Sequence, residues 1–145
     1  MSPDQDHADS DEVLLTVPAD GAYLGVLRTA AAGLAARLHF TLDEIEDLRI
    51  AVDEACAMLI RLAAPSEELR CRFALTGQDL GVEVAVPAAP ASAVPDTTSF
   101  AWKVLTALTD DARATLVDQT ATIALTARRT IIRPAPQTST ESAAE

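Results

Sequence analysis

The spacing of apolar residues changes at Pro65 from the period of a helix to that of a strand. Before this proline, apolar side chains recur every three or four residues, at Ile45, Leu48, Val52, Ala55, Leu59 and Leu62. After it they recur at every second residue, at Leu69, Cys71, Phe73 and Leu75 and again at Leu80, Val82, Val84 and Val86. Gly77-Gln78-Asp79 separates the two alternating runs and supplies a turn. The sequence therefore predicts a long helix followed by a β-hairpin with one buried face.

The rest of the core predicts further elements of the same kind. A short strand is expected over 12–17, and Asp20 is placed to cap a helix that runs to Leu38. Thr41 and Glu44 have the spacing of a capping box at the start of the long helix. A third helix is expected over about 99–108 and two more strands over 112–117 and 120–127. Adjacent helices and hairpin-connected strands predict an α+β fold, a two-layer sandwich of helices on a mainly antiparallel sheet.

The charge balance limits the kinds of partner that this chain is expected to bind. Acidic residues outnumber basic ones by 22 to 11, which gives a formal net charge of -11. Such a chain repels phosphates, so nucleic-acid binding is disfavoured and a protein partner is favoured. Only 3% of the residues are aromatic, so the core must be built from Leu, Val, Ile and Ala, which suits closely packed helices.

One domain, residues 12–133, is expected between two polar ends. Residues 1–11 and 134–145 cannot bury enough apolar surface to offset their ordering entropy, so both are predicted to be disordered. A third polar segment, 87–99, contains three prolines and is expected to be a loop over a site. No apolar run approaches membrane-spanning length and the start is unlike a signal peptide, so we expect a cytoplasmic protein without membrane contact.

Few residues are placed for catalysis or metal binding. Cys56 and Cys71 match no metal or redox spacing and are interpreted as buried small hydrophobes, and His39 as a helix-end or surface residue. On the long helix, Asp47, Glu54 and Met58 share one face. Glu54 is a candidate general base there, although the pattern alone favours reading Asp53 and Glu54 as a solvated helix face.

A family resemblance gives these residues more meaning. The segment TLDEIEDLRIAVDEACAMLI, residues 41–60, resembles the helix that carries the N box of the GHKL (Bergerat-fold) ATPases, in the branch of RsbW-type anti-sigma factors and serine kinases. The similarity extends over residues 12–64 and the closing strand TIALTARR, and so covers nearly the whole core. The order of elements derived above agrees with that fold.

The resemblance implies a nucleotide site that has lost its ligands. Glu54 takes the place of the glutamate that activates the attacking group, but the asparagine that helps to hold Mg²⁺ is replaced by Met58, whose thioether is a poor ligand for a hard cation. The aspartate-glycine box is replaced by the alanines and prolines around Ala88. The glycine-rich lid is replaced by a segment with Phe100 and Trp102. No metal site, Mg²⁺ or ATP is therefore expected, and the chain is interpreted as a pseudokinase.

The same resemblance supplies the partners. Arg28 stands where the family has an arginine that contacts both the sigma factor and its antagonist, and it is equally an ordinary solvated arginine by its sequence alone. The leading hypothesis is an anti-sigma factor that sequesters an alternative sigma factor of the stress or development type. It is countered by a STAS-domain anti-anti-sigma factor, and a homodimer is implied. Two alternatives stay open: an active ATP-dependent serine kinase that uses Glu54, and a pocket for another small ligand walled by Phe100 and Trp102. For these two aromatic residues packing in the core is favoured, because Trp102 forms a helical stripe with Leu105 and Leu108.

Overall fold

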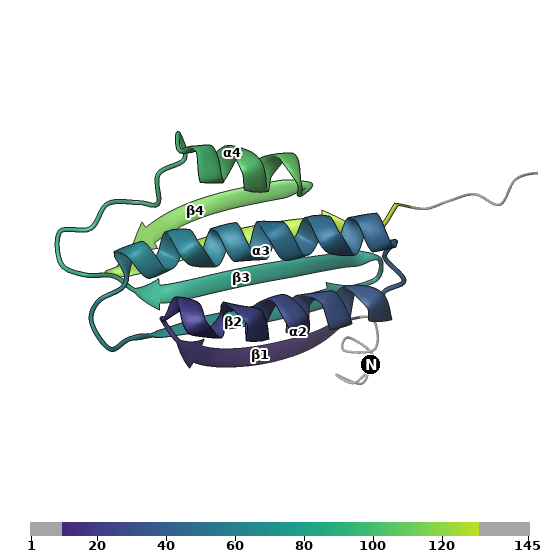
Figure 1. Ribbon diagram of the computed structural model, residues 1–145, viewed down its shortest axis with the longest axis horizontal. Coiled ribbons are helices and arrows are strands. Elements are labelled where there is room, and N and C mark those ends of the chain that lie inside the picture. The colour runs from purple at the N-terminus through teal and green to yellow at the C-terminus, as the bar shows by residue number, and fades with distance from the viewer. Residues whose placement is uncertain (1–9, 131–145) are drawn as a thin grey trace, which may run out of the picture.

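The structure is a computed structural model that describes residues 10–130. In this range five strands form one fully antiparallel sheet, in the order β1-β2-β3-β5-β4. The strands are β1 Ser10–Pro18, β2 Glu68–Thr76, β3 Asp79–Pro87, β4 Asp111–Val117 and β5 Thr120–Arg128; the helices are the 3-10 turn η1 Gly21–Tyr23, α2 Leu24–Arg37, α3 Leu42–Leu62 and α4 Phe100–Ala107. All three α-helices lie on one face of the sheet (Figure 1). The predicted two-layer α+β sandwich and its order of elements are confirmed.

The first helix differs from its prediction at its start. Asp20 does act as an N-cap, but its Oδ1 accepts a hydrogen bond from the backbone N–H of Ala22 at 2.9 Å and caps a 3-10 turn. The α-helix begins only at Leu24. At its other end, the backbone N–H of Phe40 donates to Ala35 O at 3.0 Å while His39 takes a left-handed φ of 65°. This Schellman-type stop reverses the chain and turns α3 back antiparallel to α2.

The capping box predicted for α3 is present. The backbone N–H of Thr41 donates to Glu44 Oε1 at 2.8 Å, and the N–H of Glu44 donates to Thr41 Oγ1 at 3.1 Å. Glu44 also accepts a hydrogen bond on Oε2 from the N–H of Thr130 at 2.8 Å. The Glu44 carboxylate therefore caps the start of α3 and also holds the segment after β5 against this helix.

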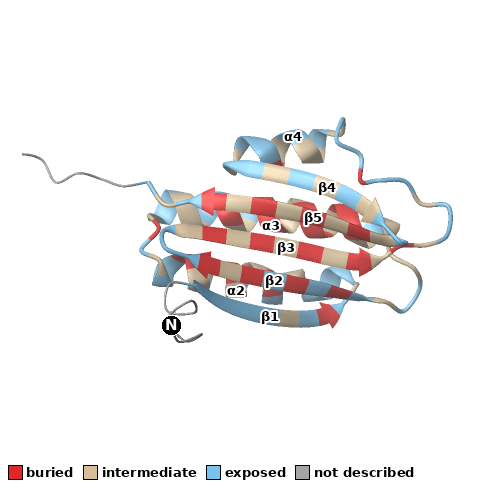
Figure 2. Ribbon diagram, turned by 180° about the vertical axis from the view of Figure 1, so that it is seen from behind, coloured by how far each residue is buried: buried red, intermediate tan, exposed pale blue. Residues whose placement is uncertain are grey.

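The core lies between the helices and the inner face of the sheet. Its largest fully buried side chains come from every element except β1, η1 and β4: Leu27 from α2, Leu48, Val52 and Leu59 from α3, Leu105 from α4, and Leu69, Phe73, Leu80, Val82, Val84, Val86 and Ile123 from the central strands. Figure 2 shows the alternation of buried and more exposed residues along these strands. Cys56 and Cys71 are free thiols inside this core, as predicted.

The expectations for the two chain ends fall mostly on residues outside the described range. Disorder was expected through residue 11, but β1 already begins at Ser10 and pairs with Thr76 of β2. The expected disorder of 134–145 lies wholly outside the described residues. Among the described residues, no helix is both long and apolar enough to cross a bilayer.

Candidate functional site

The carboxyl end of α3 is joined to the chain that leaves β3. The backbone N–H of Ala64 donates to Pro87 O at 2.9 Å, and the N–H of Ala89 donates to Leu62 O at 2.8 Å. Ala88, between these two contacts, forms an antiparallel bridge with Ala63. This end of the molecule is where the resemblance places adenine and metal contacts.

Ala88 offers a ligand neither a polar side chain nor a free backbone N–H group. Its backbone N–H donates to Gln119 O at 2.7 Å. The Gln119 side-chain amide in turn donates to the carbonyls of Ala89 at 3.1 Å and, more weakly, of Ala88 at 3.4 Å. The Ala88 methyl group is buried. An adenine base placed here would meet the Ala88 methyl group and hydrogen-bonded backbone groups. Gln119 holds this segment through its side chain and its carbonyl, a role that was not predicted from the sequence.

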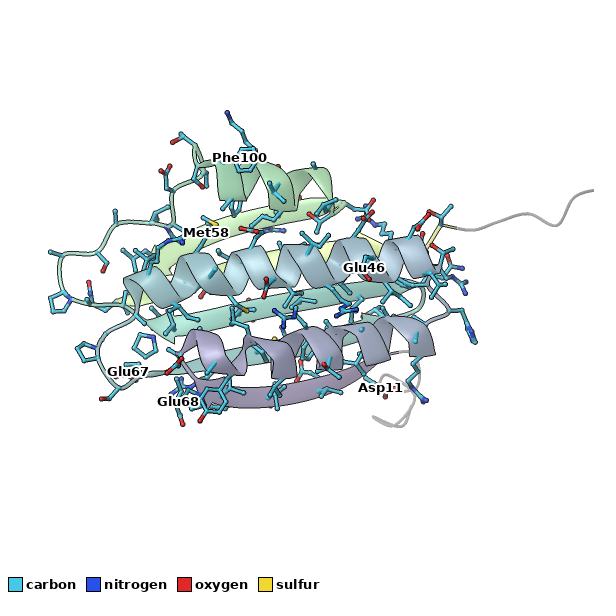
Figure 3. The ribbon with its side chains drawn as sticks, in the orientation of Figure 1. Asp11, Glu46, Met58, Glu67, Glu68 and Phe100 are labelled. Atoms are coloured by element: carbon cyan, nitrogen blue, oxygen red, sulfur yellow. The ribbon has the colours of Figure 1, made fainter. Side chains whose placement is uncertain are left out.

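A small cavity remains between α3 and the loop before α4. It has a volume of about 190 Å³ and is lined by Met58, Arg61 and Leu62 of α3 and by Pro95, Asp96 and Ser99 of the loop. Met58 is only 5% exposed and lies between α3 and the start of α4 in Figure 3. Small-molecule sites in proteins usually measure about 300–1,000 Å³, so this cavity is smaller than a nucleotide requires. The loop predicted over residues 87–99 is present between β3 and α4 and lines this cavity.

The donor set does not fit Mg²⁺ and a triphosphate. Met58 contributes a thioether where a hard cation needs oxygen. The N-terminus of α4, which could otherwise present free N–H groups to a phosphate, is capped by Ser99, whose Oγ accepts from Trp102 N at 3.1 Å. The preceding turn is also closed on itself, because Asp96 Oδ1 accepts from both the N–H and the hydroxyl of Thr98, at 2.8 and 2.6 Å. These bonds lower the pKa of Asp96.

The two aromatic residues of this segment do not line the cavity. Phe100 is 81% exposed, so the expectation that it packs in the core is wrong. Trp102 is half-buried against the core, as its helical spacing with Leu105 and Leu108 predicted. The alternative of a ligand pocket walled by Phe100 and Trp102 is therefore not what the structure contains: proline and serine close the cavity instead.

Glu54 and Asp53, adjacent in sequence, face different surroundings. Asp53 Oδ1 lies 2.7 Å from Nη1 of Arg28 on α2, and both side chains are a little over one-third exposed. In the described part of the chain, the Glu54 carboxylate takes part in no hydrogen bond or ion pair, so nothing orients it as a base. The Asp53 side chain is thus partly solvated, and its carboxylate also ties the two helices together, which the sequence pattern did not predict.

Asp47 and Met58 lie at opposite ends of the α3 face that α4 covers. Asp47 lines a second opening of about 200 Å³ near the C-terminus of α4, and Met58 lines the cavity near its N-terminus. The three-residue face predicted from helical spacing therefore exists, but only Met58 is buried on it, whereas Glu54 is partly exposed and Asp47 is exposed. Sequence periodicity could not show this, because it does not say which later element packs on a helix.

Three helices on one face of an antiparallel five-stranded sheet, with a lid-like loop and helix beside the end of the long helix, define the ATPase-like class of α+β sandwiches. The model of the histidine kinase-like ATPase domain matches residues 17–126. The chain belongs to this family.

Its relatives are named as a serine-protein kinase and as an anti-sigma factor. It is 39% identical over 79 residues to the serine-protein kinase RsbW of Bacillus subtilis (strain 168). This match covers 52% of this chain and 49% of the relative. It is 40% identical over 102 residues to the anti-sigma-F factor RsbW of Mycobacterium tuberculosis (strain ATCC 25618 / H37Rv). This match covers 68% of this chain and 58% of the relative. The chain thus spans about half the length of the curated relatives it matches.

A solved structure has the same fold. The crystal structure of the RsbU and RsbW domains of Rv1364c from Mycobacterium tuberculosis superimposes with a TM-score of 0.68 at 19% identity. The match covers 86% of this chain and 34% of that one. At this identity the likeness concerns the fold.

Proposed function

We propose that this chain is a cytoplasmic anti-sigma factor that sequesters an alternative sigma factor of the stress or development type. A STAS-domain anti-anti-sigma factor releases the sigma factor. The names of the RsbW relatives support the regulatory role, since both anti-sigma factors and kinases occur among them. The observation that carries the proposal is Arg28, a half-exposed cation on the outer helical layer at the position where the resemblance places partner contact.

Sequestration requires only a surface. A partner is held away from RNA polymerase by buried area and complementary charge, without any chemical step. We therefore propose that inhibition here proceeds without ATP-dependent kinase activity. The thioether of Met58, the satisfied backbone at Ala88 and the capped start of α4 support this part of the proposal.

Capture of native partners tests the proposal. The tagged protein is incubated with cytosol of its source organism, and bound proteins are identified by mass spectrometry and then confirmed singly with purified partners. We expect a sigma factor and a STAS-domain protein with the wild type and neither with Arg28→Glu. Arg37→Glu is the matched control, because Arg37 is an exposed arginine of the same helix. Recovery of neither partner by the wild type overturns the proposal.

An active serine kinase is the second candidate, favoured by the retained Glu54 and by the name of the Bacillus relative. Calorimetry with millimolar Mg-ATP separates the two. Saturable binding, together with phosphotransfer to the STAS partner that is lost in Glu54→Ala, would establish the kinase. We expect neither.

Two further parts of the proposal concern assembly and small ligands. The resemblance implies a homodimer, which sedimentation of the purified protein tests. A small non-nucleotide ligand remains a third candidate, because a cavity of about 190 Å³ persists beside Met58. Trp102 lies one helical turn after Ser99, which lines the cavity. Quenching of the Trp102 fluorescence by candidate metabolites is therefore a direct screen for such a ligand.

A further inference from the structure

The guanidinium of Arg28 is held on one side and open on the other. Asp53 Oδ1 accepts from Nη1 at 2.7 Å, which is the one hydrogen bond that the Arg28 side chain makes within residues 10–130. The side chain is 37% exposed, and its other nitrogens are not among the buried polar atoms left without a partner. Among the described residues, the remaining N–H groups of this partly exposed guanidinium have no hydrogen-bond partner, so they can donate to an added acceptor.

Gly25 keeps one edge of this guanidinium uncovered. A Cβ built on Gly25 would meet a single neighbour within 4 Å, Nη2 of Arg28 at 3.4 Å. Gly25 lies in α2 and has no left-handed φ, so the backbone does not require glycine there. What its missing side chain provides is space beside Nη2.

Arg72 shows how the same protein uses an arginine with two carboxylates. Its guanidinium bridges Glu12 of β1 and Glu83 of β3 on the open face of the sheet. Arg28 has one carboxylate and room for a second. Ile50, one turn before Asp53 on α3, is 40% exposed and adds an apolar neighbour on the same side of that helix.

We propose that Asp53 and Gly25 are positioning residues for partner recognition: Asp53 fixes the Arg28 guanidinium between α2 and α3, and Gly25 leaves its Nη2 edge open to a carboxylate of the sigma factor. The inference rests on the proposed function and assigns two residues to it. A guanidinium already fixed by one carboxylate loses less conformational freedom when it binds the next. The partner feature that fits is an acidic side chain beside an apolar one, which meets Ile50.

The test compares two glycine variants of the same helix. An alanine in place of either glycine is compatible with the helical backbone and favours folding. Gly25→Ala covers Nη2, and we expect about a tenfold weaker Kd for the purified sigma factor, with a Tm no lower than that of the wild type. Gly33→Ala is the control, because nothing lies within 4 Å of a Cβ there. It is expected to leave the Kd unchanged.

A charge swap separates positioning from stability. Arg28→Asp combined with Asp53→Arg keeps an ion pair between the helices but moves the guanidinium to α3. We expect the Tm to recover relative to either single variant while the Kd stays at least about tenfold weaker than that of the wild type. If Gly25→Ala binds the sigma factor as tightly as the wild type, or the swap restores binding, the positioning inference is overturned and the proposed function stands. If the wild type binds no sigma factor, the positioning inference and the proposed function are both overturned.

Discussion

Arg28 Nη1 and Asp53 Oδ1 lie 2.7 Å apart and join α2 to α3 across 25 positions of sequence. The pair is partly exposed, so its energy is limited by solvent screening and by the entropy of two ordered side chains. Its consequence for stability can be separated from any role in binding.

A double-mutant cycle with Arg28→Ala and Asp53→Ala is expected to give a coupling of about 0.5–1 kcal/mol in urea unfolding, decreasing with added salt. The control pair is Arg113 and Asp111, whose atoms are 3.6 Å apart and more exposed, and whose coupling should be close to zero. A coupling at Arg28–Asp53 no larger than at the control pair would show that the contact does not hold the helices together.

Glu44 makes stability depend on pH on the acid side. Burial raises its pKa, but hydrogen bonds from Thr130 and Thr41 outweigh this and hold the pKa below its ordinary value of 4.5. A group with a lowered folded-state pKa stabilises the protein above its unfolded-state pKa, and the stabilisation disappears as the pH falls through the folded-state value. Glu44→Gln is therefore expected to cost about 1 kcal/mol at pH 7 and progressively less below pH 4.5.

Chemical unfolding of Glu44→Gln and the wild type between pH 7 and pH 3 measures this difference. Glu46→Gln is the matched control, since Glu46 is exposed and its contact with Arg49 is long, at 3.4 Å. It should change stability by less than about 0.5 kcal/mol. A Glu44→Gln deficit that stays constant down to pH 3 would contradict the assignment.

The two thiols are expected to be unreactive in the folded protein. Burial raises the pKa of Cys71 to about 12 and also raises that of Cys56, with contributions from Cys71 and Asp53. Thiolate is the reactive form, so native protein at pH 8 should react slowly with a disulfide reagent and guanidinium-unfolded protein should release two equivalents at once. Because a raised folded-state pKa destabilises the fold as the pH passes the ordinary thiol value, stability should also decline above about pH 9.

Cys71→Ala supplies the control for the labelling experiment. The unfolded variant should release one equivalent instead of two, and its folded form should remain slow to react. Rapid labelling of the native wild type at pH 8 would mean that α3 and β2 separate far more easily than their packing indicates.

The fold could be predicted because its signals are local. Periods of two and of about 3.6, the Thr41–Glu44 capping box and the Gly77 turn each depend on a few neighbouring residues. The errors occur where tertiary contacts decide. Met58 lies on a helix face that looked open until α4 packed on it, and Phe100 looked like a core residue but projects from the start of that helix.

Only part of the site around Arg28 could be predicted from the sequence, for a related reason. Arg28 was singled out by family resemblance, whereas Asp53 was read as part of a solvated face. Their contact depends on where the chain reverses, and the left-handed residue His39 sets the register that places residue 28 opposite residue 53. The role of Gly25 is visible only once the guanidinium has been placed.

His39 itself offers a stabilising substitution. It adopts φ 65° at the end of α2, a conformation that costs a non-glycine residue about 1 kcal/mol, and its side chain is exposed. His39→Gly is expected to raise the free energy of unfolding by about 0.5–1 kcal/mol, and His39→Ala should give no gain because alanine keeps the same strain. Urea unfolding measures both, and equal stability of the two variants would contradict the backbone explanation.

Restoring an oxygen ligand at Met58 should not restore a nucleotide site. Met58→Asn buries an amide beside Leu62 and Pro95 and removes apolar contacts, so we expect a loss of about 3 kcal/mol in stability. Met58→Leu, which preserves volume and polarity, should cost less than about 1.5 kcal/mol. Neither variant is expected to bind millimolar Mg-ATP in calorimetry, since Ala88 has no polar side chain and no free N–H group for a base, and Ser99 still caps α4. Saturable Mg-ATP binding by Met58→Asn alone would show that one side chain excludes the nucleotide and that the surrounding backbone does not.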